Sequence, residues 1–135
     1  MNKAKWSQTK EPFVTNETKF YAFESDVPYT AAMLIEDLIE SGVEVNNVLY
    51  EASVGDDGPF SGGNLSAEGF LRRYDTIRTK GIAGTDYEIS CVFDGVPFRA
   101  AISDDIKGVS YNKVAFKTAE SAQFDIEALL KAMEK

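Results

Sequence analysis

The clearest hydrophobic pattern is helical and covers residues 25–42. Apolar side chains recur there three and four positions apart, which predicts one buried stripe formed by Ala31, Leu34, Ile35 and Leu38. Asp26 can cap the N-terminus, Pro28 suits the first turn, and Gly42 is placed to end the helix. The acidic positions lie towards the other side and predict a solvent-exposed face made of Glu36, Asp37 and Glu40.

Three shorter segments have the pattern of strands. Residues 20–25 (FYAFES) are rich in aromatic residues, and residues 109–116 (VSYNKVAF) also favour a strand. Residues 48–54 alternate, which places four side chains on one face: Val48, Tyr50, Ala52 and Val54. Asn46 and Asn47, just before this strand, predict a turn.

The strongest local signal is a β-hairpin over residues 86–103. Asp94-Gly95 fits a two-residue type I′ turn, because that turn needs a positive φ at both positions. Pairing outward from the turn places eight side chains on one face, in the pairs Phe93–Val96, Cys91–Phe98, Ile89–Ala100 and Tyr87–Ile102. The other face is mixed. Pro97 predicts either an edge strand or a position whose missing N–H points outward.

Two further helices are predicted. Ser66 can cap a helix through Arg78, whose shared face comprises Phe70, Leu71, Tyr74 and Ile77. A strand over 67–79 is the alternative, because this segment also contains β-formers and Gly69 weakens a helix. Thr118 can cap a C-terminal helix with apolar positions at Ala122, Ile126, Leu129, Leu130 and Met133.

The order of these elements indicates an α+β fold. We expect an antiparallel β-sheet of four to five strands packed against two or three helices on one face. Residues 1–17 are polar and predict an N-terminal arm that joins the fold near Phe13 or at Lys19. Residues 18–135 then form a single α+β domain, because the sequence shows no repeat, low-complexity tract or linker.

Residues 55–66 (GDDGPFSGGNLS) predict the one long loop of the chain. Loops of about 12 residues without secondary structure are uncommon and are often functional or disordered. Asp56 and Asp57 are candidate interface residues in this loop. Phe60 lies among glycines and is a candidate aromatic anchor for a partner. A flexible surface connection is the alternative interpretation.

Composition excludes several kinds of chemistry. The 135-residue chain has no histidine and one cysteine, which rules out Ser-His-Asp and Cys-His catalysis, histidine-ligated zinc and CxxC redox sites. Neither glycine-rich phosphate-binding fingerprint is present. Cys91 falls on the inward face of the predicted hairpin, where we expect a core residue rather than a reactive thiol. We therefore expect no catalytic residue, no metal and no cofactor.

Charge changes the expected partners. The chain carries 22 acidic and 14 basic residues, a net charge of −8. This charge repels nucleic acid and favours a basic protein partner, although a solvated acidic surface without a partner also explains it. The sequence contains no apolar run long enough to span a membrane and no secretory-signal pattern near its start. The single cysteine fits a cytoplasmic, reducing environment.

Two other groups of residues are candidates for a site. The main basic cluster comprises Arg72, Arg73, Arg78 and Lys80. With Tyr74 between them, these residues could bind a nucleic-acid backbone, a phosphate or a carboxylate, or could simply balance acids elsewhere. Three glutamates in predicted strands could line a pocket as acid and base groups, or lie on a solvated sheet face: Glu24, Glu51 and Glu88.

Three functions fit these observations. The first is a non-catalytic acidic protein-binding module, such as an inhibitor of a basic or nucleic-acid-handling protein. In size and charge the chain resembles bacterial immunity proteins and phage-encoded anti-CRISPR inhibitors, although it shares no motif with them. The second is a small ligand-binding or enzymatic domain that uses carboxylates and arginines in a pocket. The third is an accessory subunit of a larger complex, or a homodimer paired through the mixed face of the hairpin.

Overall fold

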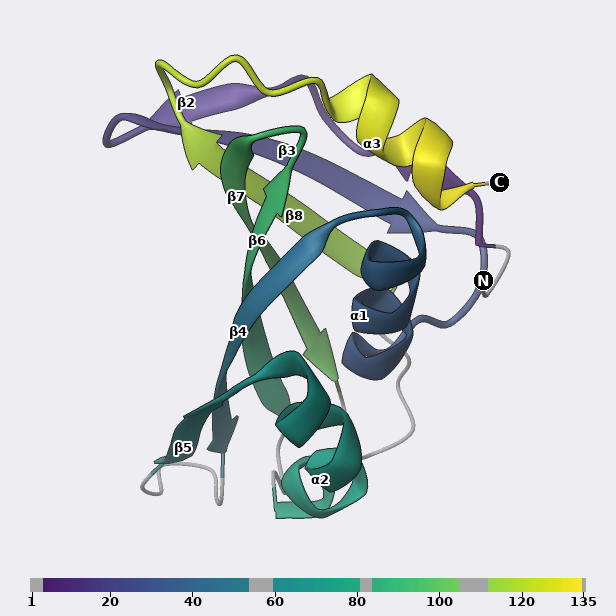
Figure 1. The fold of residues 1–135 in the computed structure, drawn as a ribbon, viewed down its shortest axis with the longest axis vertical. Helices are drawn as coiled ribbons and strands as arrows, with labels where there is room; N and C mark the ends of the chain where they lie inside the picture. The colour runs from purple at the N-terminus through teal and green to yellow at the C-terminus, as the bar shows by residue number, and fades with distance from the viewer. Residues whose placement is uncertain (1–3, 54–59, 81–83, 105–111, 135) are drawn as a thin grey trace.

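A computed structural model of the protein describes residues 4–53, 60–80, 84–104 and 112–134 (Figure 1). The strands are β1 (Trp6–Gln8), β2 (Phe13–Thr15), β3 (Thr18–Ser25), β4 (Glu44–Ser53), β5 (Phe60–Leu65), β6 (Thr85–Phe93), β7 (Val96–Asp104) and β8 (Lys113–Ala119). The helices are α1 (Ala31–Glu40), α2 (Ala67–Lys80) and α3 (Ile126–Met133). The α+β class is therefore confirmed.

The strands form one antiparallel sheet, which is larger than predicted. Its eight described strands follow the order β1-β3-β8-β7-β6-β4-β5, and β2 also pairs with β3. The sequence predicted only four to five strands. The additional strands come from two segments that gave no strand signal, the predicted N-terminal arm (β1, β2) and the second half of the predicted loop (β5).

The central hairpin forms as predicted. Phe93 pairs with Val96, Cys91 with Phe98, Ile89 with Ala100 and Tyr87 with Ile102. The turn residues Asp94 and Gly95 have φ values of 52° and 78°, as a type I′ turn requires. β7 lies between β6 and β8 and is not an edge strand. Pro97 nevertheless loses no bond to β8, because the pairing of these two strands begins at Arg99.

Two corrections concern β4 and β5. Asn46 and Asn47 lie inside β4, where a register shift between Val45 and Asn47 marks a β-bulge rather than the predicted turn. Beyond the bulge, β4 pairs with β6 on one side and with β5 on the other, so the sheet absorbs the extra residue. The predicted loop is wrong over 60–65, which forms β5, while 55–59 lie outside the described residues.

The helices are predicted well in their buried faces and less well at their ends. In α1 the predicted stripe of four apolar residues is fully buried. Thr30, rather than Asp26, caps α1 by accepting a bond from the Met33 N–H. The helix prediction for 66–78 is confirmed, and the Ser66 Oγ accepts a bond from the Gly69 N–H. Thr118 was predicted as a helix cap but lies in β8, and Asp125 caps α3 instead.

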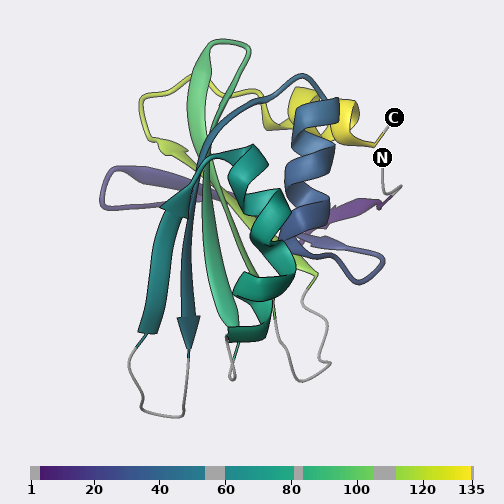
Figure 2. The same ribbon diagram turned by 60° about the horizontal axis from the view of Figure 1, so that its bottom comes forward.

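All three helices lie on the same face of the sheet (Figures 1 and 2). On this face, alternate residues of the central strands are buried, as the burial patterns of β6, β7 and β8 show. The hydrophobic core lies between these residues and the helices, and it includes Phe70 of α2 and Phe116 of β8. No helix of the described chain is long and apolar enough to cross a membrane. No described helix covers the opposite face of the sheet, which is called the uncovered face below.

Candidate functional site

The uncovered face carries a groove whose floor is made of alanines. Ala22 of β3 pairs with Ala115 of β8, which pairs with Ala101 of β7. These small side chains leave space between taller neighbours, and the resulting groove has a volume of about 690 Å³. This volume falls within the range of ligand sites. The alternation of each strand places the alanines here because the residues beside them face the core.

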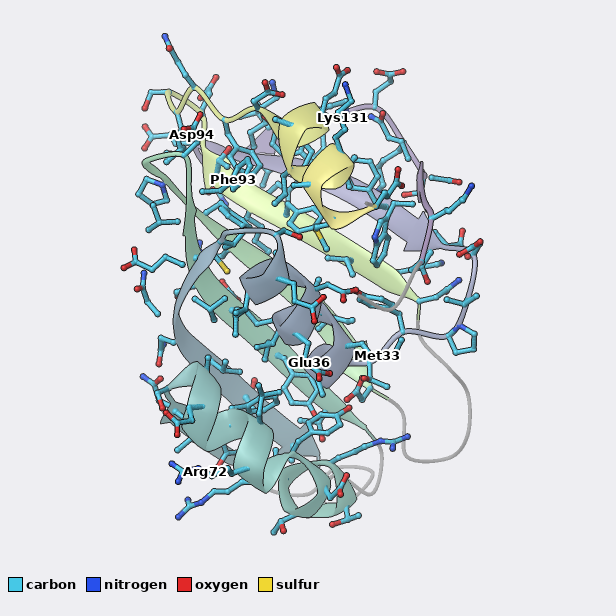
Figure 3. The ribbon with its side chains drawn as sticks, turned by 45° about the vertical axis from the view of Figure 1, so that its right-hand side comes forward. Met33, Glu36, Arg72, Phe93, Asp94 and Lys131 are labelled. Atoms are coloured by element: carbon cyan, nitrogen blue, oxygen red, sulfur yellow. The ribbon has the colours of Figure 1, made fainter. Side chains whose placement is uncertain are left out.

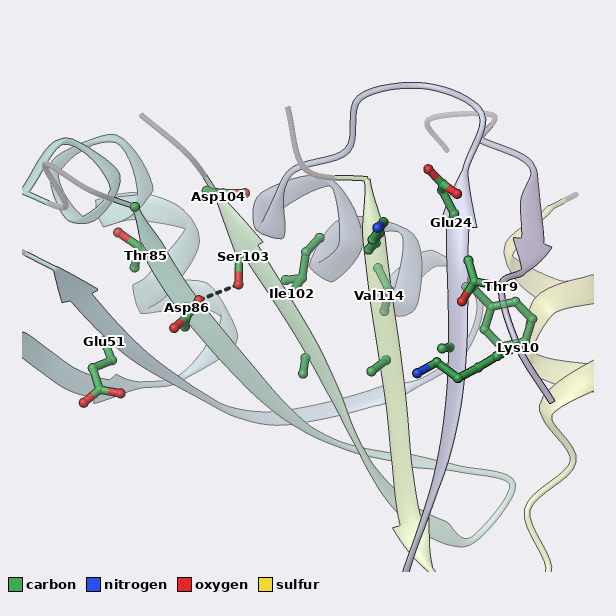
Figure 4. Close-up of a pocket in the computed structure, with 16 residues that line it drawn as sticks. Thr9, Lys10, Glu24, Glu51, Thr85, Asp86, Ile102, Ser103, Asp104 and Val114 are labelled. Carbon is green, nitrogen blue, oxygen red and sulfur yellow. Dashed lines mark hydrogen bonds between the residues drawn. The ribbon is translucent and has the colours of Figure 1, made fainter. Parts of the chain in front are cut away.

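The two walls of the groove carry different charges (Figure 4). Lys10, Lys113 and Glu24 lie on the wall next to β3 and β8. Asp86 and Glu51 lie on the opposite wall, formed by β6 and β4, where their backbones are paired. Both walls are thus polar, and their excess charges have opposite sign.

Two hydrogen bonds orient the carboxylates of these walls. The Ser103 hydroxyl donates to the Asp86 carboxylate, which holds that side chain against β7. On the other wall, the Asn112 amide donates to the Glu24 carboxylate over 3.3 Å. Serine and carboxylate belong to neighbouring strands at paired positions, so the sheet register itself fixes the first contact.

A buried polar cluster lies at one end of the groove. Asp104 is only 5% exposed, and its carboxylate accepts bonds from the Ala31 N–H and from the Tyr74 hydroxyl. The hydroxyls of Thr85 and Tyr87 are buried in the same cluster. Asp104 and Thr85 are also lining residues of the groove. The cluster therefore joins the core to the open face.

Burial dominates the protonation of this cluster. Desolvation raises the pKa of Asp104, and the hydrogen bond from Tyr74 opposes this rise. Desolvation also raises the pKa of Tyr74, and the bond to Asp104 raises it further. Burial likewise raises the pKa of Tyr87. The tyrosines are therefore neutral donors at physiological pH. In the described residues no group of His, Cys, Asp and Glu is arranged to hold a metal ion.

Glu88 lies outside the groove wall and is already neutralised. Its carboxylate pairs with Arg99 at 2.8 Å and with Lys117 at 3.7 Å. These three residues come from β6, β7 and β8 and occupy the middle of the uncovered face. Of the three strand glutamates, Glu24 and Glu51 thus line the groove, and Glu88 belongs to an ion-pair cluster.

Two of the three predicted acidic residues of α1 are exposed. Glu36 and Glu40 are one helical turn apart and face solvent. The prediction of an exposed Asp37 is wrong, because its side chain is 2% exposed and accepts a bond from the buried Tyr29 hydroxyl. The position next to Glu36 in sequence lies about 100° further around the helix, which turns Asp37 towards Tyr29. Asp37 is therefore part of the core and cannot contact a partner at the surface.

The other candidate interface residues do not meet at one place. Arg72 and Arg73 are exposed on α2 and do not line the groove (Figure 3). Asp56 and Asp57 lie outside the described residues. Phe60 has a described backbone that pairs with Ser53, but its side chain lies outside the described part. Its role as an anchor stays a prediction.

Several residues of interest gave no clear signal in the sequence. Lys10 lies in the predicted arm, which β1 and β2 bring alongside β3. Asp86 and Lys113 lie at strand ends, where an isolated charge is unremarkable. Ile39 of α1 is 47% exposed, although its sequence neighbours Leu38 and Ile35 are buried. The helical period was the one signal that could have identified Ile39, because it falls outside the buried stripe.

Cys91 behaves as predicted. Its side chain is 2% exposed, and burial raises the pKa of the thiol to about 12. The thiol is therefore protonated and inert at neutral pH. Comparison of the chain with protein-family models, with curated proteins and with solved structures gave no match, so its own geometry carries the functional argument.

Proposed function

We propose that this protein is a non-catalytic module that binds a basic protein through the outer surface of α1 and α3. The observation that carries the proposal is where the acidic excess lies. On these two neighbouring helices and their caps, five exposed acidic residues stand against one exposed basic residue, Lys131. The acids are Glu36, Glu40, Asp125, Glu127 and Glu134.

Two other described surfaces, the uncovered sheet face and α2, do not share this excess. On the uncovered sheet face, four basic and four acidic side chains alternate: Lys10, Arg99, Lys113, Lys117, Glu24, Glu51, Asp86 and Glu88. On α2 the exposed Glu68 and Asp75 are offset by Arg72 and Arg73. Of these three surfaces, the α1–α3 surface therefore best complements a basic partner. Such complementarity accelerates encounter and disfavours acidic partners.

An apolar side chain lies within this surface. Ile39 is 47% exposed and lies on the outer side of α1 between Glu36 and Glu40. Acidic residues around an exposed aliphatic group provide both long-range steering and a contact that excludes water once the partner is bound. We therefore propose Ile39, rather than Phe60, as the apolar anchor for the partner.

A nucleic-acid-handling protein is the class of partner that fits best. Such proteins carry lysine and arginine surfaces that neutralise phosphates. An acidic protein that covers such a surface competes with the nucleic acid for it. The proposed module would then act as an inhibitor, without any chemical step of its own.

The proposal is tested by capture from an extract of the host cell, read by mass spectrometry at low and at physiological ionic strength. We expect recovered basic proteins to be lost at the higher ionic strength. The double variant Glu36→Lys/Glu40→Lys should lower their recovery about tenfold or more, because it replaces attraction with repulsion. Ile39→Ala should mainly shorten the lifetime of the complex.

A matched control is available on α2. Glu68→Lys/Asp75→Lys changes the net charge by the same amount on a different exposed surface. If this variant weakens capture as much as the α1 variant, overall charge and not the α1–α3 surface governs binding. Recovery of the same proteins with all three variants would refute the proposal.

A further inference from the structure

The groove on the uncovered face holds opposite charges that do not neutralise one another. No ion pair joins Lys10 or Lys113 to Asp86 or Glu51 in the described structure. On the same face, by contrast, Glu88 is within 4 Å of both Arg99 and Lys117. The sheet therefore neutralises its central charges internally and leaves those of the groove available to a ligand.

The width of the sheet explains the difference. Lys113 of β8 and Asp86 of β6 are separated by β7, and two strand spacings amount to about 10 Å, while Lys10 beyond β3 and Glu51 on β4 lie further apart. Charges this far apart in water interact weakly, because the distance exceeds the Debye length of about 8 Å at physiological salt. Ser103, which pairs with Asp86, is too short to reach the lysine wall, and the alanines occupy the next row of the sheet, beside this one.

We propose that this groove binds a short peptide with free termini, three or four residues long. Its carboxylate would contact Lys10 and Lys113, and its amino group would contact Asp86 and Glu51. An extended chain of three or four residues measures about 10–14 Å, which is long enough to cover the separation of about 10 Å between Lys113 and Asp86. This site is separate from the α1–α3 surface and does not depend on the function proposed above.

Other features of the groove fit an extended peptide. The alanine floor lets a backbone approach the sheet closely, and the volume of about 690 Å³ is within the range of small-ligand sites. Ser103 holds Asp86 in place before a ligand arrives.

Glu24 modifies the charge of the lysine wall without reversing it. It lies beside Lys10 and Lys113, and its carboxylate accepts a bond from Asn112. Two ammonium groups against one carboxylate leave this wall with a positive excess. The opposite wall has two carboxylates and no basic residue among the lining residues. The ligand's orientation follows from this asymmetry.

The test uses tetraalanine as the probe, titrated into the full-length protein and followed by backbone amide chemical shifts. Tetraalanine with an acetylated N-terminus and tetraalanine with an amidated C-terminus each lack one charge. We expect saturable shifts with the unmodified peptide and about tenfold weaker binding for each capped form, since each loses its charge-assisted hydrogen bonds.

Variants assign each end of the peptide to a wall. Asp86→Asn/Glu51→Gln should weaken tetraalanine about tenfold but leave the affinity for the acetylated peptide unchanged. Lys10→Gln/Lys113→Gln should also weaken tetraalanine about tenfold but leave the affinity for the amidated peptide unchanged. Glu44→Gln removes an exposed charge at the other end of β4 and serves as the matched control, with unchanged binding. Ala115→Leu should fill the floor and weaken all three peptides.

Two results would overturn the proposal. One is equal affinity for the unmodified, acetylated and amidated peptides, because the charged walls would then contribute nothing. The other is no saturable shift up to roughly 10 mM peptide with a protein whose spectrum is that of the folded state. Loss of the α1–α3 partner in capture experiments would leave these results untouched, so the two proposals fail separately.

Discussion

The helix-covered and uncovered faces of the sheet are built from the same strands, but one is apolar and buried and the other is charged and open to solvent. Along β6, Tyr87, Ile89 and Cys91 are buried beneath the helices, while Glu88 and Ser90 between them are half-buried on the other side. The covered face contains aromatic clusters, such as Phe116 with Phe23 and Phe98. The uncovered face contains alanines and charges. Stability thus comes mainly from one side, which leaves the other free to bind.

The balance of acidic and basic side chains also differs from one surface of the protein to another. Acidic residues on α1 and α3 are exposed in excess, whereas charges on the uncovered sheet face are balanced in number. On that face, Glu88 forms ion pairs with Arg99 and Lys117 on the neighbouring strands. The charged residues around the alanine floor line an open groove.

The largest expected effect contrasts one phenylalanine from each face. Phe116 is fully buried on the covered face, so Phe116→Ala should lower the free energy of unfolding by about 3–5 kcal/mol. Phe20 lies on the uncovered face of the neighbouring strand, where it stacks on Phe13 at 5.0 Å. Phe20→Ala should cost less than about 1.5 kcal/mol. Urea denaturation of both variants measures the contrast, and similar losses would mean that the uncovered face also holds the fold together.

A second prediction concerns Asp104, where the covered core meets the groove. Its pKa is raised in the folded protein, so the folded state binds this proton more readily than the unfolded chain does. Stability from this group is therefore fully present below the unfolded pKa of about 3.9, and it is lost as pH rises through the folded pKa. Asp104→Asn cannot ionise and should escape this loss.

The measurement compares the two proteins by urea denaturation from pH 4 to pH 8. The free energy of unfolding of Asp104→Asn relative to the native protein should rise as pH increases from 4. The substitution also alters the bond from Tyr74, which shifts the difference by a constant amount over this range. A relative stability that is flat or falls with pH would contradict burial as the dominant influence on Asp104.

The smallest expected effect is on the ion-pair cluster of the uncovered face. Glu88→Gln should cost only about 0.2–1 kcal/mol, because its partner Arg99 is largely exposed, with 54% of its side chain accessible. The loss should shrink in molar salt. A double-mutant cycle with Arg99→Gln isolates the pairwise part. A coupling well above this range, or one insensitive to salt, would show that the uncovered face is less solvated than its geometry indicates.

Local signals predicted the elements with strong periodicity. The 86–103 hairpin formed in its expected register because turn chemistry and hydrophobic alternation agree there. The buried stripe of α1 and the helix after Ser66 were also predicted correctly. The groove was predicted only in fragments, since Glu24 and Glu51 were recognised as strand glutamates but their partners on the walls were not.

The errors occurred where distant segments supply the stabilising contacts. β1 and β2 are three residues each and pair only with β3, so nothing local marks them as strands. The ring of Trp6 in β1 packs on Tyr29 at a ring distance of 4.7 Å. The backbone N–H of Trp6 donates to the carboxylate of Glu134, just after α3. In β5, Gly63 lies beneath the Tyr50 ring, where an added Cβ would be 2.5 Å from the hydroxyl oxygen. Gly63, which favours a loop prediction in the sequence, thus permits the Tyr50 ring to pack closely on the backbone of a strand.

The sequence by itself determined the α+β class, the central hairpin, the buried faces of the helices and the absence of histidine chemistry. These properties follow from short-range periodicity, turn geometry and composition. Only the tertiary structure decided that Asp37 is buried, that the sheet has eight described strands, and that Lys10, Asp86 and three alanines meet in one groove. Strand order and the packing of helices on one face bring together residues that are far apart along the chain, and no local pattern encodes that choice.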